Sequence, residues 1–357
     1  MRSIEAGAGQ SFRFVRLVFA LLVCCGAWLL TGCERERVFQ REGYVFGTRV
    51  DVAVYTDDPR LADATIAAVL REFDRLHNTY HAWKPSELTD LNEALAQGRS
   101  REVSPELAAM LRDAQSLSEI GGGLFDPAIG ALVELWGFHT DTFEPARPDP
   151  AALAGLKAAQ PRMSDLVIEA NLISSRNPAV RIDFGGYAKG YALDLAAAIL
   201  LERGIRSALI NVGGNVMALG SKGRQPWRVG VQHPRQSGVM ATMPLYDGEA
   251  IGTSGDYQRY FELDGLRFAH ILDPRTFEPT HATQALTVLV TPRPQVGVLS
   301  DVASKPAYLA GDAWREQTRH FGIEHALRVA ADGRVEVTRA LRARLEFPES
   351  IEVRVVD

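Results

Sequence analysis

The sequence contains very little cysteine. Its three cysteines, Cys24, Cys25 and Cys33, all lie near the N-terminus, so the rest of the 357-residue chain has no thiol pair for a disulfide. That part must be stabilised by the packing of a core. Its length allows one large domain or two smaller ones, on a prior of roughly 100–200 residues per domain.

The chain also lacks a large excess of charge of either sign. It has 39 Lys and Arg against 44 Asp and Glu, for a formal net charge of −5. Because nucleic-acid-binding surfaces are usually basic, we expect no nucleic-acid partner. The sequence contains no HExxH, no GxSxG and no Cys–His pair, which argues against metalloprotease and acyl-hydrolase chemistry.

An uninterrupted hydrophobic run lies near the N-terminus. Arg13 and Arg16 precede the apolar segment from Leu17 to Leu30, as in a secretory signal peptide. Its 14 residues are fewer than the ~20 that a spanning helix needs, which disfavours the alternative of a short membrane anchor. The run ends in "LTGC", which resembles a bacterial lipobox. We therefore expect residues 1–33 to be a signal peptide and Cys33 to be lipidated.

Lipidation of Cys33 implies a lipoprotein of the bacterial cell envelope that faces the periplasm and is held at a membrane. Glu34 follows the cysteine, where an Asp would resemble an inner-membrane retention signal, so the outer membrane is slightly favoured over the inner. We expect residues 34–42 to form a charged tether and residues 43–357 to form the functional domain.

The first half of this domain predicts one strand and two helices. Polar and apolar residues alternate over Val50–Tyr55, as in a half-buried strand. Apolar residues recur at helical spacings over 58–80, and a second helix is expected over 104–123, with Ser104 as its N-cap. The stretch "PSELTDLN" is expected to be a loop between these helices.

The second half is richer in strands. Thr140–Pro150 contains several Pro and Asp residues and is predicted to be a surface connection between two lobes, followed by a short helix. Short β-type runs dominate from Asp165 onward, interrupted by one long helix over Ala188–Glu202. This order predicts an α+β protein built on an antiparallel sheet with flanking helices, in two packed lobes.

Four stretches combine glycines with polar groups. "FDPAIG" at 125–130 is either a site or a turn into a buried helix. "DFGGYAKGYALD" at 183–194 ends a strand in a glycine pair, and the next helix has backbone N–H groups at its N-terminus that suit an anion. Lys189 can add a point charge for a phosphate there. The alternative is an ordinary strand–turn–helix corner with an exposed lysine.

The other two stretches are "NVGGNVMALG" at 211–220 and "TSGDY" at 253–257, which is followed by "HILDP". The glycine pair of the former allows a ligand to approach the backbone, and Asn215 is either a partner for a ring edge or a satisfied turn residue. His270 titrates near neutral pH and can accept a proton from a hydroxyl nucleophile, with Asp273 orienting it if the turn folds back. The alternative is a structural histidine.

Taken together, these stretches resemble the ApbE family of flavin transferases. The matching stretches, in order, are "FGTRVDV", "TYHAWKPSELTDLN", "GGGLFDPAIGALVELWGF", "DFGGYAKGYALD", "ALINVGGNV", "IGTSGDY" and "HILDPRT". The resemblance implies an ApbE-like (T-fold-like) fold. It also implies that the chain cleaves FAD, attaches FMN through a phosphoester to a Ser or Thr of a target protein, and releases AMP, with Mg²⁺ as the metal.

The resemblance also implies roles for individual residues. His270 would be the base that acts on the incoming hydroxyl, and Lys189 would bind phosphate. The expected FAD-binding residues are Tyr80, Phe125, Asp126, Asp183, Gly185, Gly186, Lys189, Gly213, Gly214, Asn215, Thr253, Ser254, Gly255, Asp256 and His270. The expected metal site is Asp301 with Ala188.

One departure from the family pattern concerns this metal site. The family usually has a Thr four residues after the Asp, whereas this chain has Lys305 followed by Pro306. A charged Lys donates hydrogens and has no lone pair for a metal. Mg²⁺ then binds with more water, or Lys305 supplies part of its charge by pairing with Asp301 on one helix face, or catalysis is lost.

Metal-assisted transfer is the interpretation adopted from the sequence. The alternative is an exported FAD-binding lipoprotein that carries flavin with little or no transfer, and a third interpretation is a structural lipoprotein without flavin. Two further departures are Phe277, where the family usually has Gly, and Phe46, where it usually has Met. We expect neither to touch the chemistry, although Phe277 could reshape the entrance for the target loop.

Overall fold

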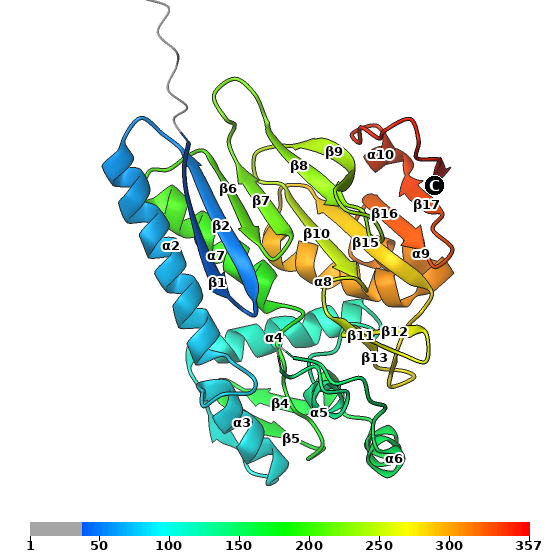
Figure 1. Ribbon diagram of the computed structural model, residues 1–357. Helices are drawn as coiled ribbons and strands as arrows, with labels where there is room; N and C mark the ends of the chain where they lie inside the picture. Colours follow the sequence, from blue (N-terminus) through cyan, green and yellow to red (C-terminus); the bar gives the residue numbers. More distant parts are fainter. Residues whose placement is uncertain (1–37, 141) are drawn as a thin grey trace, which may run out of the picture. The chain divides into compact units, whose positions relative to one another are not determined.

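A nine-stranded sheet forms the centre of the computed structural model, which describes residues 38–140 and 142–357 (Figure 1). Its strand order is β1-β2-β6-β7-β10-β15-β16-β17-β18. All neighbouring strands are antiparallel except β17 and β18, which are parallel. The predicted α+β class with an antiparallel sheet is confirmed.

The strands of this sheet are β1 (Val38–Val45), β2 (Thr48–Tyr55), β6 (Ala208–Val212), β7 (Asn215–Leu219), β10 (Ala250–Gly255), β15 (Thr283–Val290), β16 (His325–Ala330), β17 (Val335–Thr338) and β18 (Val353–Val356). Smaller sheets are formed by β3 (Arg101–Glu102), β5 (Leu172–Ser175) and β4 (Leu166–Glu169), by β8 (Trp227–Gln232) and β9 (Val239–Leu245), by β11 (Tyr260–Leu263) and β12 (Leu266–Ala269), and by β13 (Leu272–Asp273) and β14 (Glu278–Pro279). The α-helices are α2 (Pro59–Thr79), α3 (Glu87–Ala96), α4 (Pro105–Ile120), α5 (Gly130–Leu135), α6 (Pro150–Ala159), α7 (Ala188–Glu202), α8 (Val296–Leu309), α9 (Trp314–His320) and α10 (Arg339–Arg342).

Local sequence signals explain where the main helices begin. The Asp58 carboxylate accepts hydrogen bonds from the backbone N–H groups of Arg60 and Leu61 and caps α2. The Ser104 hydroxyl accepts from the N–H of Leu107 and caps α4, which ends at the predicted glycines. Both helices, and α7 over its predicted residues, are confirmed.

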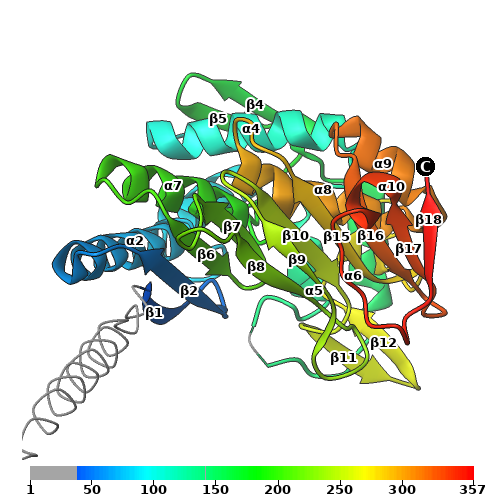
Figure 2. The ribbon, with the colours of Figure 1, turned by 90° about the horizontal axis from the view of Figure 1, so that it is seen from above.

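Both faces of the sheet are covered. Side chains alternate between the faces along each strand, so Val52 joins the core shared with α2, α7 and α8, whereas Ala53 joins the core under the β8–β9 hairpin. Figures 1 and 2 show the helices along one face and this hairpin on the other. One face of the sheet is therefore covered by a layer of helices. In this layer α7, which carries Lys189, packs against α8, which carries Asp301 and Lys305.

Two expectations about the organisation of the chain were wrong. Residues 38–42 of the expected tether are part of β1. Val38–Asp357 forms one compact unit, and its division into two packed lobes stays a prediction. "PSELTDLN" is not a loop but begins α3, where Ser86 and Thr89 form a capping box. That S-x-x-T spacing is the signal that the sequence interpretation overlooked.

Two glycine-rich stretches also differ from expectation. Gly213 and Gly214, with φ of 60° and 91°, form the turn of the β6–β7 hairpin. Residues 179–186 form no extended strand and make only an isolated bridge between Arg181 and Ile129.

Phe277 also adopts a positive φ, 64°, and its ring is buried in an aromatic cluster with Trp136 and Phe268. The positive φ explains why a glycine suits this position. Because the ring is buried, an effect of Phe277 on the entrance would have to act through its neighbours in this cluster, and that effect stays a prediction.

The expected signal peptide, lipobox and Cys33 lie outside the described residues. Within the described ranges, none of the helices combines the length and the apolar character that crossing a membrane requires.

Candidate functional site

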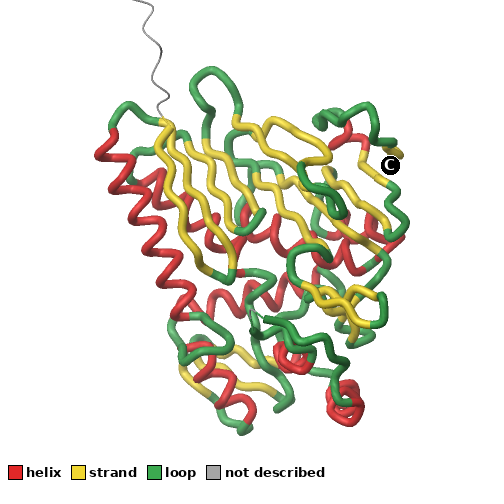
Figure 3. The backbone as a smooth tube through the Cα atoms, in the orientation of Figure 1, coloured by secondary structure: helices red, strands yellow, loops and turns green. Residues whose placement is uncertain are grey.

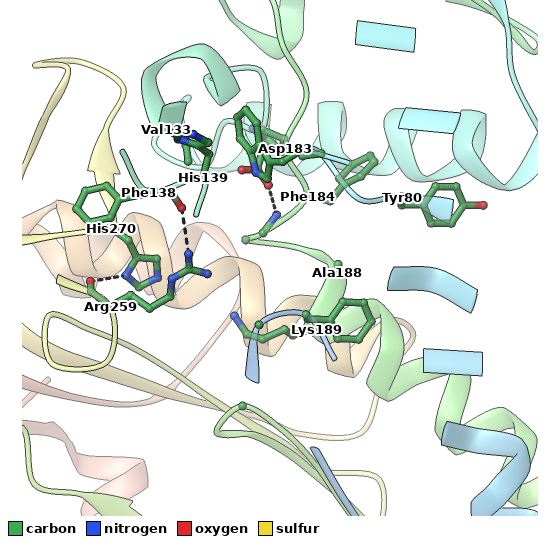
Figure 4. A pocket seen from close by; sticks show the side chains of 18 of the residues that line it. Tyr80, Val133, Phe138, His139, Asp183, Phe184, Ala188, Lys189, Arg259 and His270 are labelled. Atoms are coloured by element: carbon green, nitrogen blue, oxygen red, sulfur yellow. Dashed lines mark hydrogen bonds between the residues drawn. The ribbon is translucent and has the colours of Figure 1, made fainter. Parts of the chain in front are cut away.

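A cavity of about 1010 Å³ lies where loops at one end of the sheet meet α4 and α7. These loops are green in Figure 3, and Figure 4 shows the cavity from close by. Its volume is at the upper end of the ~300–1,000 Å³ usual for small-molecule sites, which suits a ligand as large as a dinucleotide. The wall combines aromatic rings, on which a flat ring can stack, with cationic side chains, which can bind a phosphate.

The structure brings ten of the predicted site residues to this cavity. They are Tyr80, Phe125, Asp126, Asp183, Gly185, Gly186, Ala188, Lys189, Gly213 and His270. The other predicted residues do not line it: Gly214, Asn215, Thr253, Ser254, Gly255, Asp256 and Asp301.

His270 has a fixed orientation at the cavity wall. Its Nδ1 lies 3.1 Å from the carbonyl oxygen of Arg259. Because a carbonyl can only accept, Nδ1 carries the proton, and Nε2 is the ring atom that can accept one. Burial and the nearby cations Arg259, Lys189 and Lys305 lower the pKa of His270 to about 3. The imidazole is therefore neutral at physiological pH, as a base must be.

The expected orienting residue, Asp273, does not contact His270. Its carboxylate instead accepts hydrogen bonds from the guanidinium of Arg275, the shorter at 2.7 Å. The group that orients the His270 ring is instead the backbone carbonyl of Arg259. Arg259, directly before β11, donates in turn to the carbonyls of Phe138, at 3.0 Å, and Thr140, at 3.1 Å, which joins this segment to the loop that follows α5 (Figure 4).

The predicted anion site at the start of α7 is partly filled by the protein itself. The backbone N–H of Ala188 donates to the Phe184 carbonyl, and that of Gly190 donates to Oδ2 of Asp301 at 3.1 Å. Asp183 holds the preceding turn by accepting from the N–H of Gly185 at 2.7 Å. Side-chain cations, more than helix amides, are thus the groups available for phosphate here.

Two lysines converge on the buried carboxylate of Asp301. Lys305 Nζ lies 2.6 Å from Oδ1, and Lys189 Nζ lies 3.6 Å from the same atom. Burial alone would raise the pKa of Asp301, but the two lysines lower it. Burial lowers the pKa of Lys305 to about 8, against the opposing effect of Asp301. At neutral pH the cluster therefore has two positive charges and one negative.

This arrangement does not fit the expected Mg²⁺. Each Asp301 oxygen already accepts a hydrogen, from Lys305 or Gly190, and two ammonium groups within 3.6 Å of Oδ1 repel a divalent cation. Ala188, the other expected ligand residue, lines the cavity and can contribute only its backbone oxygen. Among residues 38–140 and 142–357, no group of three or more His, Cys, Asp or Glu side chains is arranged to hold a metal ion.

The "TSGDY" stretch lies next to α8. The Ser254 hydroxyl is 2.7 Å from that of Ser304, which donates to the Asp301 carbonyl at 2.8 Å. Thr253 instead pairs with Thr287 on the neighbouring strand, at 2.9 Å between their hydroxyls. These residues therefore position the helix that carries Asp301 and Lys305.

Asp256 and Asn215 also lie outside the cavity wall. Both Asp256 oxygens accept from the Arg235 guanidinium at 2.6 Å. Asn215 is buried, and its Nδ2 has no hydrogen-bond partner among the residues that the structure describes. It is therefore not the fully satisfied turn residue of the alternative interpretation.

Two of the predicted residues at the wall have evident structural partners. The Tyr80 hydroxyl donates to Glu106 at 2.7 Å, and burial together with this carboxylate raises the pKa of Tyr80 to about 12. Asp126 accepts from the N–H groups of Ala128, at 2.9 Å, and Met163, at 3.1 Å, while burial raises its pKa to about 7. Both residues shape the wall through these bonds.

Sequence reasoning did not assign site roles to Trp83, Phe46 and Arg259, which all line the cavity. The Arg181 guanidinium lies 4.4 Å from the centre of the Trp83 ring. Phe46 lies in the β1–β2 turn with φ of 54° and lines the cavity, and the expectation that it does not touch the chemistry directly stays a prediction. Trp83 lies within a stretch that carried the family resemblance, which was the available signal.

Substitution by alanine is expected to lower stability strongly at one glycine of this region and only slightly at another. A Cβ at Gly190 would lie 2.4 Å from the backbone oxygen of Gly297, so α7 and α8 would have to separate. A Cβ at Gly186 would lie 2.9 Å from Cε of Lys305, whose methylene groups can shift slightly while Nζ keeps its hydrogen bond to Asp301. In urea unfolding, we expect Gly190→Ala to lose about 2 kcal/mol or more, and Gly186→Ala to change by less than about 1 kcal/mol.

Gly155 is the matched control, because no atom lies near the Cβ it would gain. Gly155→Ala should stabilise its helix by roughly 0.5–1 kcal/mol. Equal changes in the free energy of unfolding for Gly190→Ala and Gly155→Ala would contradict the close contact between α7 and α8.

Comparisons with known proteins agree with this picture. The sequence profile of the ApbE family matches residues 46–327. A protein named FAD:protein FMN transferase from Rhodobacter capsulatus is 43% identical over 316 residues, covering 87% of this chain and 60% of that relative. A protein of the same name from Salmonella typhimurium is 31% identical over 337 residues, covering 88% and 90%.

Solved structures show the same fold. The ApbE protein of Thermotoga maritima matches with a TM-score of 0.76 and 29% identity, over 86% of this chain and 99% of that one. The flavinyl transferase ApbE of Pseudomonas stutzeri matches with a TM-score of 0.74 and 25% identity, over 86% and 96%. This chain spans about 60% of the length of the Rhodobacter relative. With its profile match over residues 46–327, the chain belongs to the ApbE family.

Proposed function

We propose that this chain is an FAD:protein FMN transferase. The observation that carries the proposal is the convergence of a neutral His270 with the cations of Lys189 and Lys305 on one cavity of dinucleotide size. Two relatives that this chain matches over about nine tenths of their own length are named FAD:protein FMN transferase, which supports the proposal. They also make the flavin-carrier alternative less favoured.

The reaction exchanges one phosphate bond for another. The hydroxyl oxygen of a target Ser or Thr attacks the phosphorus on the FMN side of the FAD pyrophosphate, and the bond from that phosphorus to the bridging oxygen breaks. AMP leaves with the bridging oxygen and the electron pair. His270 Nε2 accepts the hydroxyl proton, which returns to solvent or to AMP, so atoms and charge balance.

The cavity residues divide into two groups in this proposal. Trp83, Phe125 and Phe46 offer apolar surface for the flat rings of FAD. Lys189 and Lys305 lie beside the pyrophosphate, where charge develops as the bond breaks. We assign no step to Mg²⁺, because the side chains around Asp301 do not fit it.

We also propose that the chain is a lipoprotein of the bacterial envelope. A lipid on Cys33 would anchor it to a membrane, with the outer membrane slightly favoured, and the protein would face the periplasm. The "LTGC" stretch after a short apolar run supports this, and the flavin-accepting protein would then be exported as well.

A mass measurement tests the transferase proposal. The full chain is incubated with FAD and the acceptor protein of the Rhodobacter relative, with that relative as the positive control. We expect the acceptor to gain the mass of FMN and AMP to appear in equal amount. Retained FAD with an unmodified acceptor, while the control enzyme modifies it, would favour the flavin carrier instead.

A further inference from the structure

The Lys305 ammonium is held in one place by two hydrogen bonds, and its stem lies close to a backbone glycine. Its Nζ lies 2.6 Å from Oδ1 and 2.7 Å from the backbone oxygen of Asp301, one helical turn earlier in α8. Its stem crosses Gly186, where a Cβ would lie 2.9 Å from Cε. The side chain as a whole is 17% exposed and lines the cavity. A lysine so constrained acts as a fixed charge and not as a flexible surface group.

The net charge of this cluster is positive, as a site for an anionic pyrophosphate needs to be. Lys189 and Lys305 bring two positive charges to the single negative charge of Asp301. Adding a divalent cation would place further positive charge beside two ammonium groups, at a carboxylate whose two oxygens each already accept a hydrogen. Removing Lys305 would lower the net charge of the cluster from +1 to zero and release Oδ1 of Asp301 from its 2.6 Å hydrogen bond.

We propose that the Lys305 ammonium takes the place of the divalent cation in this chain, so that FMN transfer proceeds without a metal ion. The inference rests on the proposed transferase function. Lys305 contributes charge to the pyrophosphate and makes or breaks no covalent bond, so the balance of the reaction is unchanged. A purely structural Lys305–Asp301 pair predicts instead that transfer still requires a metal.

The first test measures metal binding without any turnover. Mn²⁺ serves as the spectroscopic probe, and the unbound ion is counted by electron paramagnetic resonance in titrations of the full chain with and without FAD. We expect no stoichiometric Mn²⁺ site in the native protein. We expect one to appear in Lys305→Thr, which frees Asp301 and adds a hydroxyl. Lys157→Thr is the matched control, because it removes a lysine from an exposed pair with Glu278.

The second test measures transfer in EDTA and in Mg²⁺. The native rates should agree within about two-fold. Loss of the charge in Lys305→Met should lower the rate by about 100-fold or more in EDTA, while Lys305→Arg keeps the charge and should retain more of it. Lys305→Thr should be slow in EDTA and recover in Mg²⁺. Circular dichroism and bound-FAD fluorescence verify that each variant is folded.

The outcomes separate this inference from the proposed function. Stoichiometric Mn²⁺ binding by the native chain, or loss of its transfer in EDTA, would overturn the metal replacement while leaving the transferase intact. Absence of transfer in every buffer, with the Rhodobacter control active, would overturn the transferase function. The Mn²⁺ titration would in that case still decide whether Lys305 excludes a metal.

Discussion

Replacing His270 with Gln is expected to lower the rate of FMN transfer by about 10²–10⁴-fold. The glutamine amide can still donate to the Arg259 carbonyl but cannot take a proton from the acceptor hydroxyl. FAD binding should change by only a few fold, because the cationic groups remain. Single-turnover AMP release, together with an FAD titration by flavin fluorescence, measures both quantities.

The matched control is His320→Gln, which changes an exposed histidine near Glu316 and should leave both quantities unchanged. An equal loss of FAD affinity and turnover in His270→Gln would instead indicate a binding role. In that case the assignment of His270 as the base would fail.

The low pKa of His270 adds a pH signature to the same variant. Between the unfolded value of 6.5 and the folded value of about 3, the unfolded chain binds the proton and the folded chain does not. Stability from this group therefore falls as the pH decreases through that window, by up to about 1.4 kcal/mol per pH unit. The difference in unfolding free energy between native and His270→Gln proteins should follow this slope, and it should be constant above pH 7.

Local signals in the sequence predicted the elements better than their arrangement. Asp58, Ser104 and the glycines after α4 define helix ends through their own backbone contacts, so the neighbouring residues were sufficient to locate α2 and α4. The order of the nine strands depends on contacts between distant segments, such as β2 with β6, and no local pattern contains it.

The candidate site shows the same division. His270 and Lys189 stand in motifs, and the structure brings both to the cavity. The orientation of His270 by the Arg259 carbonyl was not predictable, because a backbone group has no residue-specific signal. The i,i+4 spacing did allow the pair of Lys305 with Asp301 to be foreseen. The addition of Lys189 from α7 depends on the packing of two helices.

Replacing Asp301 with Asn is expected to lower the free energy of unfolding by about 2–4 kcal/mol, somewhat below the ~3–5 usual for a broken buried ion pair, because both lysine side chains are partly exposed. The amide leaves two ammonium groups side by side without a counter-charge. Urea unfolding followed by circular dichroism measures the loss. Asp332→Asn is the control, since that carboxylate pairs with Arg334 on the exposed surface and should change stability far less.

A double variant identifies the cause of this loss. If repulsion between the lysines is responsible, Lys305→Met should recover part of the stability lost in Asp301→Asn, because only Lys189 then remains at the buried amide. The two substitutions should therefore be less than additive, as expected for groups in direct contact. Strict additivity would show that Asp301 stabilises the fold mainly through the Gly190 N–H, and that the lysines contribute little. The cluster would then be too weakly coupled for Lys305 to act as a fixed charge.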